Sequence, residues 1–324
     1  MTHVDLLAFD PTHIEGAAAL LADRHRRQRA QQPLLAERYE DPASSAKELA
    51  SLLATDDASG AVAMDGDDVV AYLLGAPKSG SHWGPNIWVE AAGHAAREPE
   101  LIRDLYAFAG QQWFDAGRTA HYVLAPTHDE GLLTAWWRLG FGQQHAHGIQ
   151  PPRRINPGDD PRVEIRRAAA PDIPDMARLD LALPGHQARA PVFSAGVTPT
   201  LEEAITDAQE SIEDSRFTNF VAVLDGHVVG LAIGCALEQS SSHQSLARPE
   251  NAGFLGFAAV DESARGKGVG RRLGETVIDW ASSEGYDSVV TDWRVTNLLS
   301  SRTWPRLGFT ETFLRLHRNI GISG

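Results

Sequence analysis

The amino-acid sequence repeats one order of features in its two halves, and this repeat limits the folds that the chain can adopt. Residues 60–75 and 219–234 each contain an apolar run, an Asp-Gly pair and a second apolar run. An Asp-Gly pair between two apolar runs is typical of a two-stranded hairpin with a tight turn. Residues 136–141 and 304–309 form a second matching pair in the same order. These ordered matches predict two domains that arose by duplication.

A loop-rich segment separates the two halves. The stretch QPPRRINPGDDPR, residues 150–162, contains four prolines and an Asp-Asp pair, which interrupt any helical or strand period. A length of 324 residues also fits two domains better than one. We therefore predict a first domain over residues 1–150, a linker over 151–162 and a second domain over 163–324.

The charge and cysteine content exclude several kinds of partner. Lys and Arg total 29 and Asp and Glu total 43, so the formal net charge is -14. A surface of this charge repels phosphate backbones and anionic lipid, so we expect neither nucleic acid nor membrane as a partner. The single cysteine, Cys235, allows no intramolecular disulfide and no thiolate cluster, and we expect no metal. Because no leader-like or membrane-spanning apolar stretch stands out, we expect a cytoplasmic protein.

The C-terminal half has the alternating pattern of a mixed α/β domain. Thr200, with Glu203 three residues later, fits a capping box at the start of a helix, and Gly285 stands where a helix would end. Strands are expected over residues 163–167, 254–260, 288–293 and 310–318, and helices over 171–179, 200–214, 269–285 and 298–307.

A glycine loop between a strand and a helix carries the clearest chemical signal, at residues 260–270. Backbone N–H groups of such a loop, together with the helix N-terminus, point at an anion. Gly268 and Gly270 remove the Cβ atoms that would obstruct a phosphate. Because Arg265, Lys267 and Arg271 add positive charge to an acidic chain, the loop predicts a phosphate or pyrophosphate ligand.

The segment Arg265-x-x-Gly268-x-Gly270, after a strand that ends at Val260, resembles the signature of the GNAT superfamily of acyl-CoA-dependent N-acyltransferases. Asn297, followed by Gly308-Phe309, is similar to a later motif of that family. The resemblance covers residues 163–317 in motif detail and the N-terminal half only through the repeat. It implies an α/β (α+β) fold of two GNAT-like domains, each a mixed, mostly antiparallel twisted sheet flanked by helices, with acetyl-CoA as cosubstrate.

The same resemblance implies which residues hold the cosubstrate. Asn297 would face the pantetheine or the thioester end, and Ser300 could line the same slot. Asn297 could instead serve only to cap its helix, and Ser300 could serve only to allow close packing. Backbone groups of Ala258, Ala259 and Val260 would pair with the pantetheine arm, and Arg265, Gly266, Lys267, Gly268, Val269, Gly270 and Arg271 would hold the pyrophosphate.

The chain departs from the family pattern at the acid and the base. Trp304 stands where many GNAT enzymes carry a tyrosine that protonates the leaving thiolate, and an indole N–H is not a usable acid. Asp292 and Glu250 are the candidate general bases, because a carboxylate beside the cofactor strand could accept a proton from an ammonium group. His243 and His317 are further alternatives, and all four side chains could instead be structural.

The N-terminal half lacks the glycine loop. In the aligned segment, Arg97 takes the place of Arg265, while Glu100 and Ile102 replace the two glycines. Acidic side chains there would repel a pyrophosphate, so we expect a degenerate domain that binds no CoA.

These observations predict an N-acetyltransferase that moves an acetyl group from acetyl-CoA to a primary amine of a small, cationic acceptor. One alternative is a non-catalytic module that binds acyl-CoA as a sensor or regulator, which the missing tyrosine favours. Another is acetylation of lysine side chains or N-termini of proteins.

Overall fold

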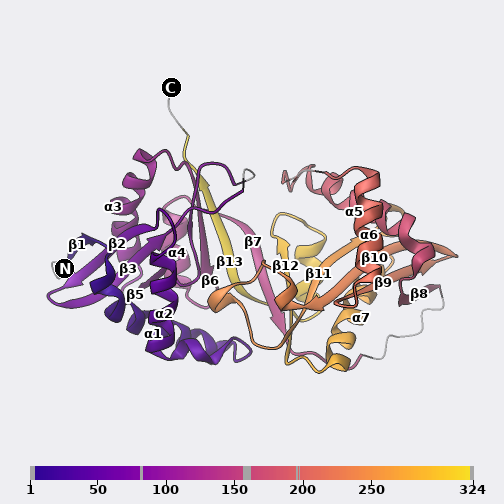
Figure 1. Cartoon of the computed structure of the whole chain (residues 1–324), viewed down its shortest axis with the longest axis horizontal. Coiled ribbons are helices and arrows are strands. Elements are labelled where there is room, and N and C mark those ends of the chain that lie inside the picture. Colours follow the sequence, from indigo (N-terminus) through magenta and orange to yellow (C-terminus); the bar gives the residue numbers. More distant parts are fainter. Residues whose placement is uncertain (1–3, 81–82, 156–161, 195, 197, 322–324) are drawn as a thin grey trace. The chain divides into compact units, whose positions relative to one another are not determined.

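The computed structural model describes residues 4–80, 83–155, 162–194, 196 and 198–321. Residues 156–161 of the predicted linker lie outside this description. By contacts the chain divides into two compact units (Figure 1). Unit 1 comprises Met1–Ala146, Gln244–Arg248 and Glu311–Gly324, and unit 2 comprises His147–His243 and Pro249–Thr310.

Unit 1 packs helices against a four-stranded antiparallel sheet and a second, mixed group of strands. The antiparallel sheet has the order β1-β2-β3-β5, while β4 pairs parallel and β13 antiparallel with β6. The elements are β1 Asp5–Ala8, α1 Ile14–Gln31, α2 Pro42–Leu53, β2 Ser59–Asp65, β3 Asp68–Gly75, β4 Asn86–Val89, β5 His94–Ala96, α3 Leu101–Asp115, β6 Ala120–Pro126, α4 Glu130–Arg138, β7 Gly142–Gln150, whose last four residues fall in unit 2, and β13 Thr310–Asn319.

Unit 2 has the mixed sheet expected from the sequence. Its strands follow the order β8-β9-β10-β11-β12, antiparallel except for the parallel pair β11–β12. Thr200 caps α6 in the predicted capping box, and Gly285 ends α7 in a left-handed conformation. The elements are β8 Val163–Arg167, α5 Ile173–Gln187, α6 Leu201–Glu213, β9 Phe217–Leu224, β10 His227–Ala236, β11 Ala252–Val260, α7 Val269–Glu284, β12 Ser288–Arg294 and α8 Ser300–Arg306.

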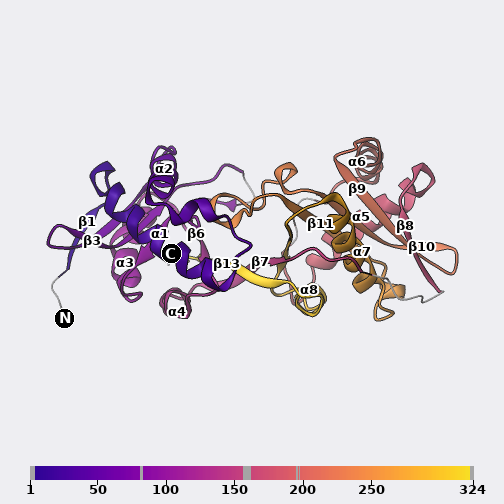
Figure 2. The ribbon, with the colours of Figure 1, turned by 90° about the horizontal axis from the view of Figure 1, so that it is seen from below.

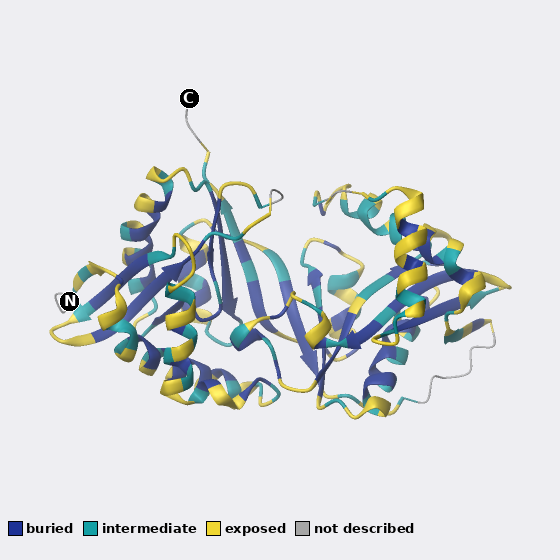
Figure 3. Cartoon of the chain, in the orientation of Figure 1, coloured by how far each residue is buried: buried dark blue, intermediate teal, exposed yellow. Residues whose placement is uncertain are grey.

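Alternate residues of β10 explain how helices cover both faces of the unit 2 sheet. Leu231 packs with α5 and α6 in one core cluster. Gly230 and Gly234 point the other way, where a Cβ atom would approach Val269 and Trp280 of α7. The two faces follow from the period of two along a strand. Figure 2 shows α7 in front of these strands, and Figure 3 shows buried strands beneath helices whose outer faces are exposed.

The two units repeat one irregular feature of the hairpin. In unit 1, Val70 is an extra residue between the pairs Met64↔Val69 and Ala63↔Ala71. In unit 2, Val229 is extra in the same way between Val228↔Val223 and Gly230↔Ala222. The Val70 carbonyl accepts a hydrogen bond from the Arg97 N–H at 2.9 Å, and the Val229 carbonyl accepts one from the Asp261 N–H at 2.8 Å. Arg97 and Asp261 each directly follow the strand that pairs with the bulged strand. The shared bulge supports duplication independently of the sequence match.

This shared register corrects the predicted alignment of Arg97. The pairs Ala71↔Ala96 and Gly230↔Val260 make Arg97 the counterpart of Asp261, and not of Arg265. The connection that follows is also shorter in unit 1, running only over residues 97–100 before α3, whereas residues 261–268 precede α7. Unit 1 therefore has no counterpart of the glycine loop.

The final strand belongs to unit 1, although the linear division predicts it in the second domain. β13 pairs with β6 from Phe313↔Pro126 to Asn319↔Ala120. Phe313 is fully buried in the main core cluster of unit 1. The contacts of β13 thus place it in unit 1, although it follows the elements of unit 2 in the sequence.

Candidate cofactor-binding and catalytic site

The strands β11 and β12 separate partway along their length. Their parallel pairing runs from Ala252↔Ser288 to Leu255↔Thr291, and among the described residues no pair joins the two strands beyond that point. Gly256 is an extra residue in β11, because Gly234 pairs with Leu255 while Ile233 pairs with Phe257. A bulge bends its strand and increases the local twist, so β11 turns away from β12 here. The predicted residues Ala258, Ala259 and Val260 follow this bend.

The loop after β11 leads into the N-terminus of a long helix. Gly266 and Gly268 have φ values of +76° and +80°, a conformation that side chains other than glycine rarely adopt. A Cβ atom at Gly268 would meet nothing within 4 Å, so this side of the loop is open. Gly270 is also unobstructed, with Val260 Cγ2 at 3.6 Å from the position of a Cβ.

The start of α7 fits an anion. Gly268 is its N-cap and offers no side chain, and the first turn holds no acidic residue. The first backbone bond of the helix is from Arg272 N–H to Gly268 O, at 3.1 Å. The N–H groups of residues 269–271 precede that bond and lack intrahelical acceptors, and the helix dipole adds positive potential.

The predicted cationic residues differ in their availability to a ligand. Arg265 is partly buried, with a side-chain exposure of 31%, and lies 4.0 Å from Glu262. Lys267 is exposed. Arg271 is exposed and pairs at 2.7 Å with Glu275 one turn along α7. Arg265 and Lys267 therefore supply most of the positive charge that the loop can direct to an anion.

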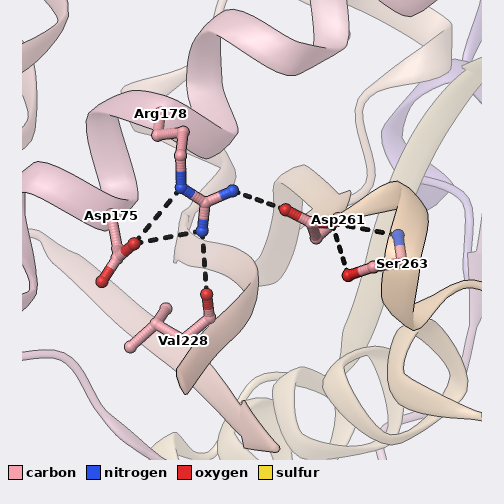
Figure 4. A network of polar contacts seen from close by, with 5 residues as sticks. All are labelled: Asp175, Arg178, Val228, Asp261 and Ser263. Carbon is pink, nitrogen blue, oxygen red and sulfur yellow. Dashed lines mark hydrogen bonds and ion pairs between the residues drawn. The ribbon is translucent and has the colours of Figure 1, made fainter.

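An arginine from α5 fixes the start of the loop (Figure 4). Arg178 donates to the Asp261 carboxylate at 2.6 Å and to the Val228 carbonyl at 2.9 Å. Asp261 in turn accepts from the Ser263 hydroxyl at 2.7 Å and from the Ser263 N–H at 3.0 Å. These bonds to Ser263, followed by the contact with Arg178, hold the pKa of Asp261 below its ordinary value. The anionic Asp261 thus ties α5, β10 and the loop together.

Asn297 forms a local turn just before α8, whose N-cap is Leu299. Its Oδ1 atom accepts the Leu299 N–H at 3.1 Å and lies 3.3 Å from His186 Nε2, and its backbone carbonyl accepts from Ser300 Oγ at 3.4 Å. A contact with the cofactor stays a prediction for both Asn297 and Ser300.

Trp304 is a core residue. It is 7% exposed and faces Phe309, with ring centroids 6.3 Å apart. On the other side it packs on α7 at Gly274, where a Cβ atom would come within 3.1 Å of the indole.

The candidate bases lie in different environments. Asp292 follows the last paired residue of β12, with its side chain 20% exposed, and His243 Nδ1 lies 4.0 Å from its carboxylate. Glu250 is exposed and lies two residues before the start of β11. His317 belongs to unit 1, where its ring stacks near Tyr122 at 6.4 Å. Asp292 is thus the carboxylate at the point where the strands separate.

A pocket of about 600 Å³ in unit 2 borders β11 at its bulge. Burial raises the pKa of Cys235, one of its lining residues, to about 11, so this thiol stays protonated at neutral pH. The lining includes three aromatic rings, Phe217, Phe254 and Phe257, and three carboxylates, Asp207, Glu210 and Asp214, the last paired with Arg216 at 2.6 Å.

In unit 1, the side chain of His94 spans from β5 to β6, the position that corresponds to the gap between β11 and β12 in unit 2. The pairs Leu73↔His94 and Ala232↔Ala258 make His94 the counterpart of Ala258. Burial, aided by the Arg24 charge, lowers the pKa of His94 to about 3, so its ring is neutral. His94 Nδ1 lies 3.3 Å from Trp136 Nε1, which donates to it, leaving Nε2 to donate to the Leu124 carbonyl on β6 at 3.2 Å. Arg24 also donates to the carbonyl of His94, which further fills this space.

Comparisons with known proteins agree with the fold of both units. Residues 186–309 match the model described as the acetyltransferase (GNAT) family. A GCN5-related N-acetyltransferase of Sphaerobacter thermophilus has a TM-score of 0.55 at 17% identity, covering 98% of this chain and 97% of that chain. A tandem GNAT protein from the clavulanic acid biosynthesis pathway covers 99% of this chain and 100% of that one, at 14% identity and a TM-score of 0.48.

Among curated proteins, the N-acetylaspartate synthetase of Rattus norvegicus is 31% identical over 90 residues. That match covers 28% of this chain and 27% of the synthetase, so the chain spans about a quarter of its relative's length.

The family match is confined to residues 186–309 of unit 2, and the likeness over the whole chain shows a fold shared with a GCN5-related N-acetyltransferase. The predicted fold class, with its mixed sheets flanked by helices, is confirmed. Among the described residues, no helix is long and apolar enough to cross a membrane, and no group of three or more potential ligands is suited to a metal.

Several features of the site were not anticipated from the sequence. The bulge at Gly256 and the contact between Arg178 and Asp261 depend on strand register and on a helix 83 residues away. The nearness of His243 to Asp292 depends on a long connection between β10 and β11. The Asp261-x-Ser263 pattern, which is typical of a local cap, was the one available signal for the role of Asp261.

Proposed function

We propose that this chain is an acetyl-CoA-dependent N-acetyltransferase whose unit 2 binds the cosubstrate and acetylates a primary amine. The observation that carries the proposal is the combination of separated strands, β11 and β12, with an open glycine loop at the N-terminus of α7. The family match over residues 186–309 supports the same assignment.

The residues present fit the chemistry of acetyl-CoA. The N–H groups at the start of α7, with Arg265 and Lys267, would hold the pyrophosphate, because uncapped helix N-termini bind anions. Residues 258–260 offer backbone N–H and C=O groups on the edge that β12 leaves, and these would pair with the amide groups of the pantetheine arm. When bound, acetyl-CoA supplies an activated acetyl thioester. Asn297 and Ser300 remain candidates for its thioester end.

The pocket beside the bulge supports a small cationic acceptor. Asp207 and Glu210 are exposed on α6 and give this pocket a negative potential, while Phe254 and Phe257 offer faces that attract a cation. A protonated amine would be drawn to such a pocket and would then need to lose a proton before it attacks. Asp292 and Glu250 are the carboxylates that we propose for this step.

The test is release of free thiol from acetyl-CoA by the full chain, followed with a thiol reagent against a panel of amines. Mono- and polyamines, amino sugars, amino acids and a lysine-containing peptide cover the acceptor classes. We expect turnover with small cationic amines, and we expect the product to be heavier by one acetyl group. Turnover only with the peptide would favour protein acetylation instead.

A non-catalytic sensor is the second candidate, and the burial of Trp304 at the tyrosine position favours it. Tight binding of acetyl-CoA without thiol release from any amine would support that function and contradict catalysis. The expectation of a cytoplasmic setting remains a proposal that rests on composition.

A further inference from the structure

An imidazole and a carboxylate meet where β11 and β12 separate. Asp292 follows the last pairing of β12 with β11, and its side chain is 20% exposed. His243, from the connection between β10 and β11, is 1% exposed, and its Nδ1 atom lies 4.0 Å from Asp292 Oδ2. A buried imidazole therefore lies beside a partly exposed carboxylate.

Contacts from three segments hold the ring of His243. Ser242 Oγ lies 2.8 Å from Nδ1. The ring of Phe254 on β11 meets it edge-on with centroids 5.6 Å apart, and the ring of His147 on β7 lies at 4.2 Å. Because Phe254 and His147 belong to two other strands, their rings limit the orientations that the imidazole can adopt.

The charges around His243 favour the uptake of one proton. Among the described residues, two titratable groups that lie against His243 are Asp292 on β12 and His147 on β7. An anionic carboxylate at this distance favours an imidazolium, whereas burial and a second imidazole disfavour further positive charge.

We propose that Asp292 and His243 together accept the proton of the acceptor amine. Asp292 accepts the proton from the amine. His243 does not contact the amine and acts through Asp292, from which it accepts the proton. This inference rests on the proposed acetyl transfer. A lone carboxylate has an ordinary pKa near 4 and is a weak base at neutral pH, whereas an imidazole has an ordinary pKa of about 6.5. A base works best when its pKa is close to the working pH.

The proposed step transfers one proton to Asp292 and His243, forms one C–N bond and breaks one C–S bond. The ammonium group gives one proton to Asp292. Because 4.0 Å separates its carboxylate from His243 Nδ1, the two groups must close to hydrogen-bond distance before the proton passes to the ring, which later releases it to solvent. The nitrogen lone pair forms the C–N bond with the acetyl carbon, and the C–S bond breaks with its electron pair on sulfur. The second proton on nitrogen neutralises the thiolate. The products are an amide, a free thiol and one released proton.

The first experiment is an NMR titration of the histidine rings in the full chain, which needs no turnover. Asp292→Asn removes the carboxylate charge, so the pKa of His243 is expected to fall by about 1 pH unit or more. His227→Asn, which alters an exposed histidine at the start of β10, is the matched control and should leave His243 unchanged. If Asp292→Asn leaves the titration of His243 unchanged, the pair does not exist and the inference is wrong.

The second experiment is the pH profile of kcat with the best amine of the panel. In His243→Asn the acid limb should move to lower pH, and kcat at neutral pH should fall by about 10-fold or more, with the KM for acetyl-CoA unchanged. His243→Gln repeats the test in case the first variant folds poorly. A wild-type profile in a folded His243 variant would overturn the inference. If the wild-type chain acetylates no amine, the proposed function fails, and the NMR titration alone decides whether the pair exists.

Discussion

At the scale of single residues, the site depends on positions with little or no side chain as much as on its charged side chains. Gly266 and Gly268 adopt left-handed conformations that open the loop, and Ala258 leaves space where unit 1 carries His94. Trp304 fills the position of a family acid without offering an acidic proton. The proposed chemistry is therefore expected to depend on carboxylate and imidazole groups near the end of β12.

Trp304→Phe should leave turnover within a few-fold of wild type. The indole packs between Gly274 and Phe309, so it contributes shape to the contact between α7 and α8. A general acid contributes about 100-fold or more, so its removal would be clearly visible in kcat. The measurement is kcat with the best amine, with thermal unfolding as the control for folding. A loss of about 100-fold in a folded, cofactor-binding variant would show that the ring takes part in the chemistry.

At the scale of elements, the contrast between the two units explains why only one should bind the cosubstrate. In unit 2, β11 bends away from β12 at Gly256, and among the described residues the pairing of the two strands ends at Leu255↔Thr291, before Ala258. In unit 1, the ring of His94 reaches from β5 to the Leu124 carbonyl on β6. One side chain thus closes the space that the proposed pantetheine arm requires.

Ala258→His should copy this closure into unit 2. The new ring is expected to span toward β12 and to weaken acetyl-CoA binding by at least about 10-fold, equal to about 1.4 kcal/mol. Ala258→Ser is the matched control, because it adds a polar atom without spanning the gap. Calorimetric titration measures both, and thermal unfolding checks the fold. Unchanged affinity in folded Ala258→His would refute the proposed path of the arm.

Local signals predicted most of these elements, and non-local contacts account for the rest. The hairpins, the capping box at Thr200 and the left-handed Gly285 depend on neighbouring residues, so the sequence alone indicates them. The helix expected to end at Leu179 continues to Gln187, with Pro184 inside it, because packing with α6 stabilises the additional turns. The glycine loop was predicted with its place between strand and helix. The partner of Asp292 was not, because His243 comes from a distant connection.

At the scale of the whole molecule, the two units are not two consecutive stretches of sequence. β13 completes unit 1 through its pairing with β6, and Leu246 and Ala247 are buried in the core of the same unit. Repeat detection from sequence predicts order along the chain, but it carries no information on which edge strand pairs with which sheet. The stability of unit 1 is therefore expected to depend on the C-terminal end of the chain.

Phe313→Ala should destabilise unit 1. Phe313 is 0% exposed in the core cluster of that unit, and large-to-small changes at such sites cost about 3–5 kcal/mol. The measurement is urea unfolding combined with hydrogen exchange, which should show lost protection in residues 4–146. Phe193→Ala, at a side chain that is 76% exposed, is the control and should change little. Loss of protection confined to unit 2 would contradict the assignment of β13.

The most direct test of the central claim is calorimetric titration of acetyl-CoA into Gly268→Glu and Gly226→Glu. Both glycines have φ of +80° with nothing within 4 Å of a Cβ, so the two changes introduce the same charge and similar backbone strain. Gly268 begins α7 at the proposed pyrophosphate site, whereas Gly226 lies in the β9–β10 turn. We predict that Gly268→Glu abolishes binding and that Gly226→Glu retains it within a few-fold. Equal affinity in the two folded variants would contradict the account.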